Sequence, residues 1–387
     1  MRIEPTEQQK DALIKSTHWW KTQFKQVWEI SGAAGTGKTT IVYMLIEELG
    51  LDPKDVLFMA YVGKATLALA RKGNFAQTIH STIYYIHDEP MYDDTGAPII
   101  SNGRIVTKPK FVKRDELPRN IKLLVVDEGA MVSEHIAHDI LSFGLPVVVL
   151  GDINQLPPVF GNSYFLQKPD VILTEPMRQA LNSPIVKLAQ MAMNGKYIKF
   201  GKYGDNCFVI KKDAITETML TKSDIVICGK NSTRTHMNKH IRENILNIHK
   251  RYPTIGEKLI CRQNNWKLPP IDNNIYLING LIGYVDDVSL ESFDGRSIAI
   301  DFRPEFLLNE KFNNITLDYK YLLNPSDHTY RFLNKFEYAY AITCHLAQGS
   351  EYDKVFIYDE HLGTNDYYKR WLYTAITRAK KGLILAI

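Results

Sequence analysis

SGAAGTGKTT, residues 31–40, contains the spacing G-x-x-x-x-G-K-[ST] from Gly32 to Thr39. The apolar run at 27–30 predicts a strand before it, and the apolar spacing over 39–49 predicts a helix after it. Glycines in such a turn let backbone N–H groups point at a phosphate, at a helix N-terminus that favours anions. The stretch therefore predicts a nucleoside-triphosphate site on an α/β sheet.

Two side chains of this loop carry the expected phosphate chemistry. Lys38 would neutralise the β- and γ-phosphates, and Thr39 would ligate Mg²⁺. The other expected nucleotide contacts are with the rest of the loop, namely Gly32, Ala33, Ala34, Gly35, Thr36, Gly37 and Thr40. Mg²⁺ is thus an expected cofactor together with the nucleotide.

Further short apolar runs extend the predicted sheet. Residues 56–60, 123–126 and 147–150 are continuous β-type runs, and helical or loop segments separate them. Runs of this kind are typical of parallel strands that are buried on both faces. The first part of the chain is therefore predicted to be a parallel α/β domain.

The strand predicted at 123–126 runs directly into two carboxylates, Asp127 and Glu128. An Asp at the carboxyl end of such a strand can reach the Mg²⁺ that the phosphate loop holds. The adjacent Glu128 is placed to orient and deprotonate an attacking water. A kinase needs no base for water, so this pair favours hydrolysis.

The third polar segment, GDINQLPPV at 151–159, also follows a buried strand. Gln155 can hydrogen-bond a γ-phosphate or the attacking water. The two prolines stiffen the loop, so a change in phosphate state could move it as a unit.

Bulk composition sets wider bounds. The 387 residues are 45% hydrophobic with a net charge of +4, which excludes a disordered chain and permits nucleic-acid binding without demonstrating it. The four cysteines lie at no metal-ligand or redox spacing and are predicted to be reduced thiols. The N-terminus lacks a signal-peptide core and no apolar run is long enough to span a bilayer, so we expect a soluble, cytoplasmic protein without a membrane partner.

The three polar elements, in this order, resemble the motor core of superfamily 1 helicases, which are driven by ATP. Other segments match motifs of the same superfamily in chain order: PTEQQKDAL (5–13), MAYVGKATLAL (59–69), TIHS (78–81), LTEPMRQA (173–180), ITCHLAQGSEYDKV (342–355) and LYTAITRAKKGL (372–383). The resemblance covers nearly the whole chain. It implies two RecA-like parallel-sheet motor domains with ATP between them.

The resemblance also assigns roles to residues in these segments. Gln9 matches the adenine-reading glutamine, Arg178 and Arg378 match arginine fingers, and Glu351 is a further nucleotide contact. The residues that match nucleic-acid contacts are Val62, Lys64, His80, Thr343 and His345. Read from the residues alone, His80 could equally be a core histidine.

Details resemble the RecD-like and Dda-like branch, superfamily 1B, and the compact size resembles phage helicases. GEKLICRQNNW and YLINGLIGYV look like the SH3-like β-barrel of that branch, and the insert at 82–120 occupies the place of its strand-splitting pin, a β-hairpin. The expected domains are 1–170 for the first motor domain, 171–250 plus 336–387 for the second, and 251–335 for the barrel.

This branch implies translocation from 5′ to 3′ along single-stranded DNA, unwinding of forked duplex, a monomeric motor, and a role in DNA replication or repair. Two alternatives remain open: a translocase or remodeller that does not split duplex, and a helicase that acts on RNA. One departure from the family pattern is Leu346, where relatives usually carry a lysine that could touch the nucleic-acid backbone.

Overall fold

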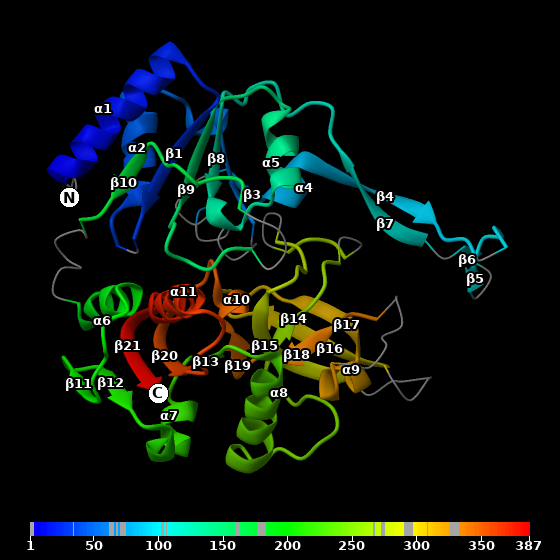
Figure 1. Ribbon diagram of the computed structural model, residues 1–387. Coiled ribbons are helices and arrows are strands. Elements are labelled where there is room, and N and C mark those ends of the chain that lie inside the picture. The colour runs from blue at the N-terminus through cyan, green and yellow to red at the C-terminus, as the bar shows by residue number, and fades with distance from the viewer. Residues whose placement is uncertain are drawn as a thin grey trace. The chain divides into compact units, whose positions relative to one another are not determined.

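The computed structural model (Figure 1) describes residues 4–33, 35–61, 66, 69, 75–93, 95–101, 104–105, 107–158, 163–175, 183–265, 268–271, 275–289, 297–307, 309–325 and 333–387. The chain forms two compact units. Unit 1 comprises residues 1–61, 65–153 and 157–175, and unit 2 comprises 62–64, 154–156 and 176–387. In the part of the chain that is described, no helix has the length and apolar character needed to cross a bilayer.

A six-stranded sheet, parallel throughout, forms the centre of unit 1, in the order β10-β1-β9-β8-β2-β3. Its strands are β1 (Val27–Gly32), β2 (Val56–Ala60), β3 (Ala76–Thr78), β8 (Leu123–Asp127), β9 (Val147–Gly151) and β10 (Val171–Leu173). The parallel sheet predicted from the continuous apolar runs is confirmed. β3 and β10 are short edge strands that the apolar pattern did not indicate.

Both faces of this sheet are buried, because alternate residues of each strand enter different cores. One core packs α1 (Glu7–Thr22) and α2 (Lys38–Glu48) against the sheet, and the other packs α4 (Ile79–Ile83) and α5 (Glu134–Leu141). Unit 1 also contains two 3₁₀ turns, Pro53–Asp55 and Gly129–Met131.

The insert in unit 1 is a long antiparallel hairpin. β4 (Tyr84–Pro90) pairs with β7 (Thr107–Lys113) along its whole length, from Tyr84 opposite Lys113 to Pro90 opposite Thr107. β5 (Ile100–Ser101) and β6 (Arg104–Ile105) form a second small ladder near its end. In Figure 1 this ribbon extends away from the parallel sheet of its own unit. Gly96, near its end, has φ +84°.

Unit 2 contains a second six-stranded sheet, ordered β11-β12-β21-β20-β13-β19 and parallel except for β11. Its strands are β11 (Gly201–Tyr203), β12 (Cys207–Ile210), β13 (Ile225–Cys228), β19 (Ala341–Thr343), β20 (Tyr352–Tyr358) and β21 (Ala379–Ala386). One face carries α6 (Pro184–Met193), α10 (Cys344–Ala347) and α11 (Asn365–Ile376). The other carries α7 (Glu217–Thr221) and α8 (Asn231–His240), which continues as a π-turn at Ile241–Ile245.

A separate five-stranded antiparallel sheet lies between β13 and β19 in the sequence. Its order is β17-β16-β15-β14-β18, formed by β14 (Lys258–Cys261), β15 (Ile282–Ser289), β16 (Ser297–Pro304), β17 (Phe312–Asp318) and β18 (Phe336–Tyr338), with α9 (Tyr319–Leu323) after β17. Within this sheet, β14 to β17 lie in the segment 251–335, where the sequence predicted a small β-barrel. Closure of the sheet into an SH3-like barrel stays a prediction.

Buried ion pairs connect this antiparallel sheet to α8 within unit 2. Arg242 donates from Nε to Oε1 of Glu257 at 2.7 Å. Arg234 on α8 bonds Oε2 of Glu337 at 2.7 Å, and Arg262 on β14's exit bonds Oε1 of the same carboxylate at 2.8 Å. Charges this deeply buried persist only when they are paired.

Candidate functional site

The loop after β1 is shaped by glycines that no other residue could replace. A Cβ on Gly32 would lie 2.5 Å from Oγ1 of Thr36 and 2.9 Å from Cβ of Leu173. Gly37, with φ +81°, occupies the left-handed region immediately before α2. The backbone therefore folds closely around the helix N-terminus, in the way that a phosphate-binding loop requires.

Lys38 places its charge inside this loop. Its ammonium donates to the main-chain oxygens of Gly32 at 2.6 Å and Ala33 at 3.3 Å. Thr39 and Thr40 follow in the first turn of α2, and both are half-buried. The loop thus brings an ammonium, two hydroxyls and a helix N-terminus to one place.

Gln9 is buried beneath the loop and is bonded at both ends of its amide. Nε2 donates to the carbonyl of Thr36 at 2.9 Å, and Oε1 accepts the N–H of Thr6 at 3.0 Å. Thr6 in turn caps α1 by accepting the N–H of Gln9. The neighbouring Gln8 is partly exposed and donates from Nε2 to the carbonyl of Ile172 on β10.

Asp127 and Glu128 lie at the carboxyl edge of the same sheet. Asp127 is the last residue of β8, which pairs with β9, and β9 pairs with β1, so the carboxylate and the phosphate loop emerge at one edge. Glu128 adopts φ +53° and donates its N–H to Oδ1 of Asp127 at 2.9 Å. Glu128 therefore lies in a sharp turn directly after the strand that ends at Asp127.

The segment that contains Gln155 packs with unit 2. The N–H of Leu156 donates to Oγ1 of Thr374 at 3.0 Å, and Nε2 of Gln348 donates to the carbonyl of Leu156 at 3.0 Å. Gln155 itself is buried. Both Gln348 and Thr374 lie inside the motif segments quoted above, but the sequence analysis did not predict a role for them. The signal that could have identified each is a polar residue in a mostly apolar segment.

Arg378 is buried and its guanidinium is held by unit 2. Nε donates to the carbonyl of Thr374 at 3.0 Å, Nη1 to that of Ser350 at 3.1 Å, and Nη2 to Oγ1 of Thr377 at 3.1 Å. Glu351, the next residue after Ser350, is exposed and pairs with Lys380 at 3.1 Å. Arg378 is therefore fixed by three hydrogen bonds, whereas Glu351 is an exposed side chain with one ion pair.

His80 lies in an aromatic cluster of unit 1. Its ring centroid is 5.7 Å from each of the rings of Tyr61, Tyr84 and Phe111. Burial lowers the pKa of His80 below its ordinary value. Tyr61 and Phe111 are partly exposed and extend the cluster to the surface, and sequence reasoning did not single them out.

Thr343 and His345 lie together where β19 passes into α10. Thr343 is buried as the N-cap residue of α10, and burial lowers the pKa of the half-buried His345. Leu346, the departure from the family pattern, packs against the core that α10 and α11 share. Its role here is that of an apolar packing residue.

Four residues predicted to act in the site, Ala34, Val62, Lys64 and Arg178, lie outside the described residues. The structure tests none of their assigned roles.

Two protein-family profiles match the chain. The AAA domain family matches residues 21–161, which include the phosphate loop and both carboxylates. The UvrD-like helicase C-terminal domain family matches residues 338–386, which include Thr343, His345 and Arg378.

Sequence relatives include an ATP-dependent RecD2 DNA helicase from Deinococcus radiodurans, 26% identical over 382 residues, which covers 91% of this chain. The chain spans about half the length of that relative, 45%. The ATP-dependent DNA helicase Pif1 of Campylobacter jejuni is 24% identical over 409 residues, covering 90% of this chain and 86% of the relative.

Solved structures share the fold. A structure of two coordinating Pif1 helicases at forked duplex DNA matches with a TM-score of 0.58 and 19% identity, over 100% of this chain and 92% of that one. Bacteroides Pif1 bound to single-stranded DNA matches with a TM-score of 0.57 and 18% identity, at the same coverage. The α/β architecture with parallel sheets is thus that of Pif1 helicase structures.

Proposed function

We propose that this chain is an ATP-driven DNA helicase of superfamily 1B, in view of its similarity to RecD2 and Pif1 helicases and of the two family profiles that match it. The observation that carries this proposal is the shared edge of unit 1, where Lys38 in a closely folded loop and Asp127 at a strand end emerge together. A helix N-terminus, an ammonium and a carboxylate are the groups that a magnesium nucleotide needs.

The residues of the phosphate loop fit Mg²⁺ and ATP. The Gly32 position has no room for a side chain, so the backbone can approach phosphates, and the Lys38 ammonium already lies within the loop. Thr39 and Asp127 would hold the metal ion, which supplies charge neutralisation at the β- and γ-phosphates. Glu128 is the proposed base for the attacking water, with Gln155 orienting it.

Arg178 and Arg378 are proposed to stabilise charge that grows on the γ-phosphate. The three carbonyl and hydroxyl partners of Arg378 hold its guanidinium in a fixed orientation within unit 2. Gln9 and Glu351 are the remaining proposed nucleotide contacts. The Gln9 amide uses one N–H and one lone pair on Thr36 and Thr6, so one further N–H and one further lone pair would be available for adenine.

Single-stranded DNA is the proposed track, travelled from 5′ to 3′. Val62, Lys64 and His80 would contact it from one motor domain, and Thr343 and His345 from the other. Closure and reopening of the two motor domains with each ATP cycle would step the strand along. The proposed domain limits are 1–170, 171–250 plus 336–387, and 251–335, with the antiparallel sheet as an SH3-like barrel.

The hairpin of β4 and β7 is proposed to be the pin that splits duplex DNA. Its length, its distance from its own sheet in Figure 1 and the exposed apolar side chains near its end, Tyr92, Ile100 and Ile105, support this role. Exposed apolar groups at the end of a long ribbon can stack against the terminal base pair.

The test is strand displacement on forked DNA with a 5′ tail, compared with a 3′ tail, in the presence of ATP and Mg²⁺. We expect unwinding of the 5′-tailed fork only, and loss of both hydrolysis and unwinding in Lys38→Ala. Intact ATPase without unwinding of either fork would contradict the helicase proposal. ATPase stimulation by RNA that equals or exceeds stimulation by DNA would point to an RNA track.

Shortening the hairpin separates the helicase from a translocase that does not unwind. Pro90 and Thr107 are directly opposite each other, so a two-residue Asn-Gly turn can replace residues 91–106 without breaking the ladder of β4 and β7. We expect this variant to keep DNA-stimulated ATPase and lose unwinding. Unwinding at the original rate would show that the end of the hairpin takes no part in strand separation. Equal loss of ATPase and unwinding would show that the hairpin end has a structural role.

A further inference from the structure

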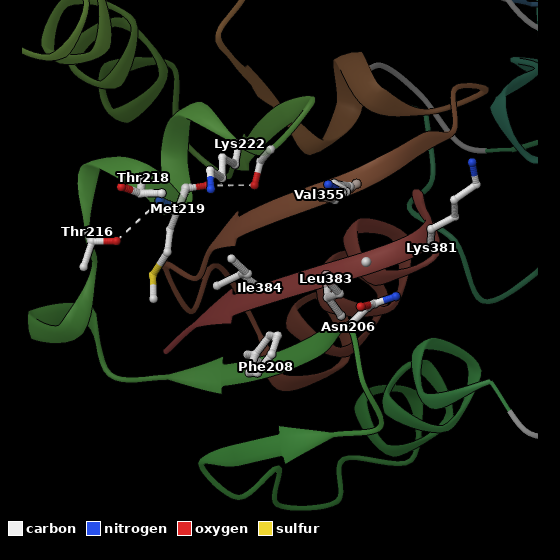
Figure 2. A pocket seen from close by; sticks show the side chains of 13 residues that line it. Asn206, Phe208, Thr216, Thr218, Met219, Lys222, Val355, Lys381, Leu383 and Ile384 are labelled. Atoms are coloured by element: carbon white, nitrogen blue, oxygen red, sulfur yellow. Dashed lines mark hydrogen bonds between the residues drawn. The ribbon is translucent and has the colours of Figure 1, made fainter.

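Unit 2 contains a groove that the motor chemistry does not use. It has a volume of about 390 Å³ and lies between α7 and the strands β12, β20 and β21. Pockets that bind ligands commonly have volumes of roughly 300–1,000 Å³. Figure 2 shows its lining, which comes from three strands and the segment around α7.

The floor of the groove is apolar. Phe208 on β12 and Ile384 on β21 are direct partners in the parallel ladder, so both side chains project from the same face of the sheet. Met219 extends from α7 toward Ile384 (Figure 2). Phe208 is 37% exposed, which is unusual for a phenylalanine on a strand of a covered sheet. An apolar side chain from outside could therefore bury itself here.

The rim of the groove is basic. Lys222, Lys354 and Lys381 line it, and no carboxylate is among the described lining residues. Lys381 pairs with Asp353 at 2.7 Å, whereas neither Lys222 nor Lys354 has an ion-pair partner within the described part of the chain. A second acidic group, Asp224, accepts the backbone N–H of Lys354. Three lysines against these two carboxylates leave the rim with an excess of one positive charge.

The groove lies at the amino-terminal edge of the parallel sheet. Lys222 precedes β13, Lys354 is near the start of β20, and Asn206 precedes β12. The proposed DNA contacts Thr343 and His345 lie beyond the carboxyl end of β19, at the opposite edge. Ligands of open α/β sheets bind at the carboxyl edge, so this groove is separate from the proposed track.

We propose that this groove docks an acidic peptide segment of a partner protein, with one large apolar side chain seated on Phe208, Ile384 and Met219. The lysine rim complements carboxylates on either side of that side chain. Single-stranded DNA is the less suitable occupant, because base stacking needs successive aromatic platforms and Phe208 is the one aromatic side chain among the described lining residues.

The test measures binding of a fluorescein-labelled octapeptide of Asp and Glu with a single central Phe to the full chain, by fluorescence polarisation at low salt. Three variants are compared with the unmodified protein: Phe208→Ser, the double change Lys222→Glu with Lys354→Glu, and the control Lys187→Glu on α6, which covers the other face of the same sheet. Thermal melting verifies that each variant is folded.

We expect saturable binding that weakens about tenfold in the double lysine variant, since two exposed charges are reversed. Phe208→Ser, or a peptide with Ser in place of its Phe, should weaken binding as well, and Lys187→Glu should not. No saturable binding at millimolar peptide, or equal affinity in all variants, would overturn the proposal. A matching loss of single-stranded DNA affinity in the double lysine variant would assign the groove to nucleic acid and overturn it too.

Discussion

The side-chain amide of Gln9 donates to the main-chain carbonyl of Thr36, 2.9 Å away, and so joins the first turn of α1 to the phosphate loop. The same amide accepts the N–H of Thr6 through its oxygen, and Gln9 is 2% exposed. A buried amide with both ends bonded fixes what it touches. Gln9 therefore positions the loop, in addition to any contact that it makes with adenine.

Replacing Gln9 with Ala should weaken nucleotide binding by loosening this loop. The carbonyl of Thr36 would lose its buried partner, which costs about 1–3 kcal/mol. We expect KM for ATP to rise about tenfold with a smaller fall in kcat, and Tm to fall by a few degrees. ATPase kinetics and calorimetry measure both.

The matched control is Gln8→Ala, because Gln8 precedes Gln9 on α1 but is partly exposed and bonds Ile172 and Thr174, away from the phosphate loop. Its KM should stay within about twofold of the original value. If Gln9→Ala raised KM without any fall in Tm, Gln9 would contact the nucleotide alone and would not position the loop.

The sequence predicts the central strands of the sheet in unit 1 well, since β2, β8 and β9 are continuous apolar runs that are typical of buried strands. The edge strands β3 and β10 escaped prediction because three residues are too few to show a period. α1 was also missed as a helix, because its sequence is mostly polar and its stability depends on the Thr6 cap and on Trp19 in the core.

The sequence likewise predicts site residues that depend on local spacing, but not those that depend on distant contacts. Lys38 and Asp127 follow from local spacing, because a loop and a strand end are defined by neighbours in sequence. The hydrogen bonds of Leu156 with Gln348 and Thr374 span 192 and 218 residues, and no local pattern encodes them. Partners so distant depend on which strands lie side by side, and this order is a property of the folded sheet.

Arg378 should prove structurally important as well as catalytic. Its three hydrogen bonds join the end of α11 to the carbonyl of Ser350. Arg378→Ala should lower Tm by a few degrees, because it removes the donor to the carbonyl of Ser350, at about 1–3 kcal/mol. Differential scanning calorimetry measures this loss. Arg378→Lys should recover part of Tm but not ATPase activity, since an ammonium lacks the planar fork of donors.

His80 should contribute to DNA binding without a charge. Burial lowers the pKa of its imidazole below 6.5, so the ring is neutral at pH 7.5. His80→Gln should weaken single-stranded DNA binding while the slope of log K against log salt stays the same. Lys64→Ala should reduce that slope by about 0.7, the value for one phosphate contact on a single strand. Affinities measured from 50 to 300 mM NaCl test both changes.

The same lowered pKa has a consequence for stability. A histidine whose pKa is depressed in the folded state binds its proton more readily when the chain is unfolded, so its contribution is present above pH 6.5 and is lost as pH falls through the folded value. Tm of the original protein should decline more steeply than that of His80→Gln between pH 6.5 and 5. If Tm of the two proteins fell equally over this pH range, groups other than His80 would cause the loss of stability in acid.

Glu337 should be a stabilising centre of unit 2, because its one carboxylate pairs with two guanidinium groups. Arg234 is bonded to it at 2.7 Å and Arg262 at 2.8 Å. The side chains of Arg234 and Glu337 are 5% exposed, and that of Arg262 is half-buried. Burial lowers the pKa of Arg234, and the charge of Glu337 opposes this effect. Glu337→Gln would leave the buried charge of Arg234 uncompensated, at a cost of about 3–5 kcal/mol.

Hydrogen exchange followed by mass spectrometry locates this cost within the chain. Amides of β14 and β18 should lose protection in Glu337→Gln, whereas those of β1 in unit 1 should not. The control is Asp205→Asn, which removes the exposed partner of Lys202 at 3.4 Å and should leave protection unchanged. A triple change, Glu337→Leu with Arg234→Met and Arg262→Met, should restore protection, because the cost comes from the stranded charges and not from loss of the pairs themselves. The triple variant could instead show as little amide protection in β14 and β18 as Glu337→Gln does. Unit 2 would then be stabilised by the hydrogen bonds of this cluster and not by its charge balance.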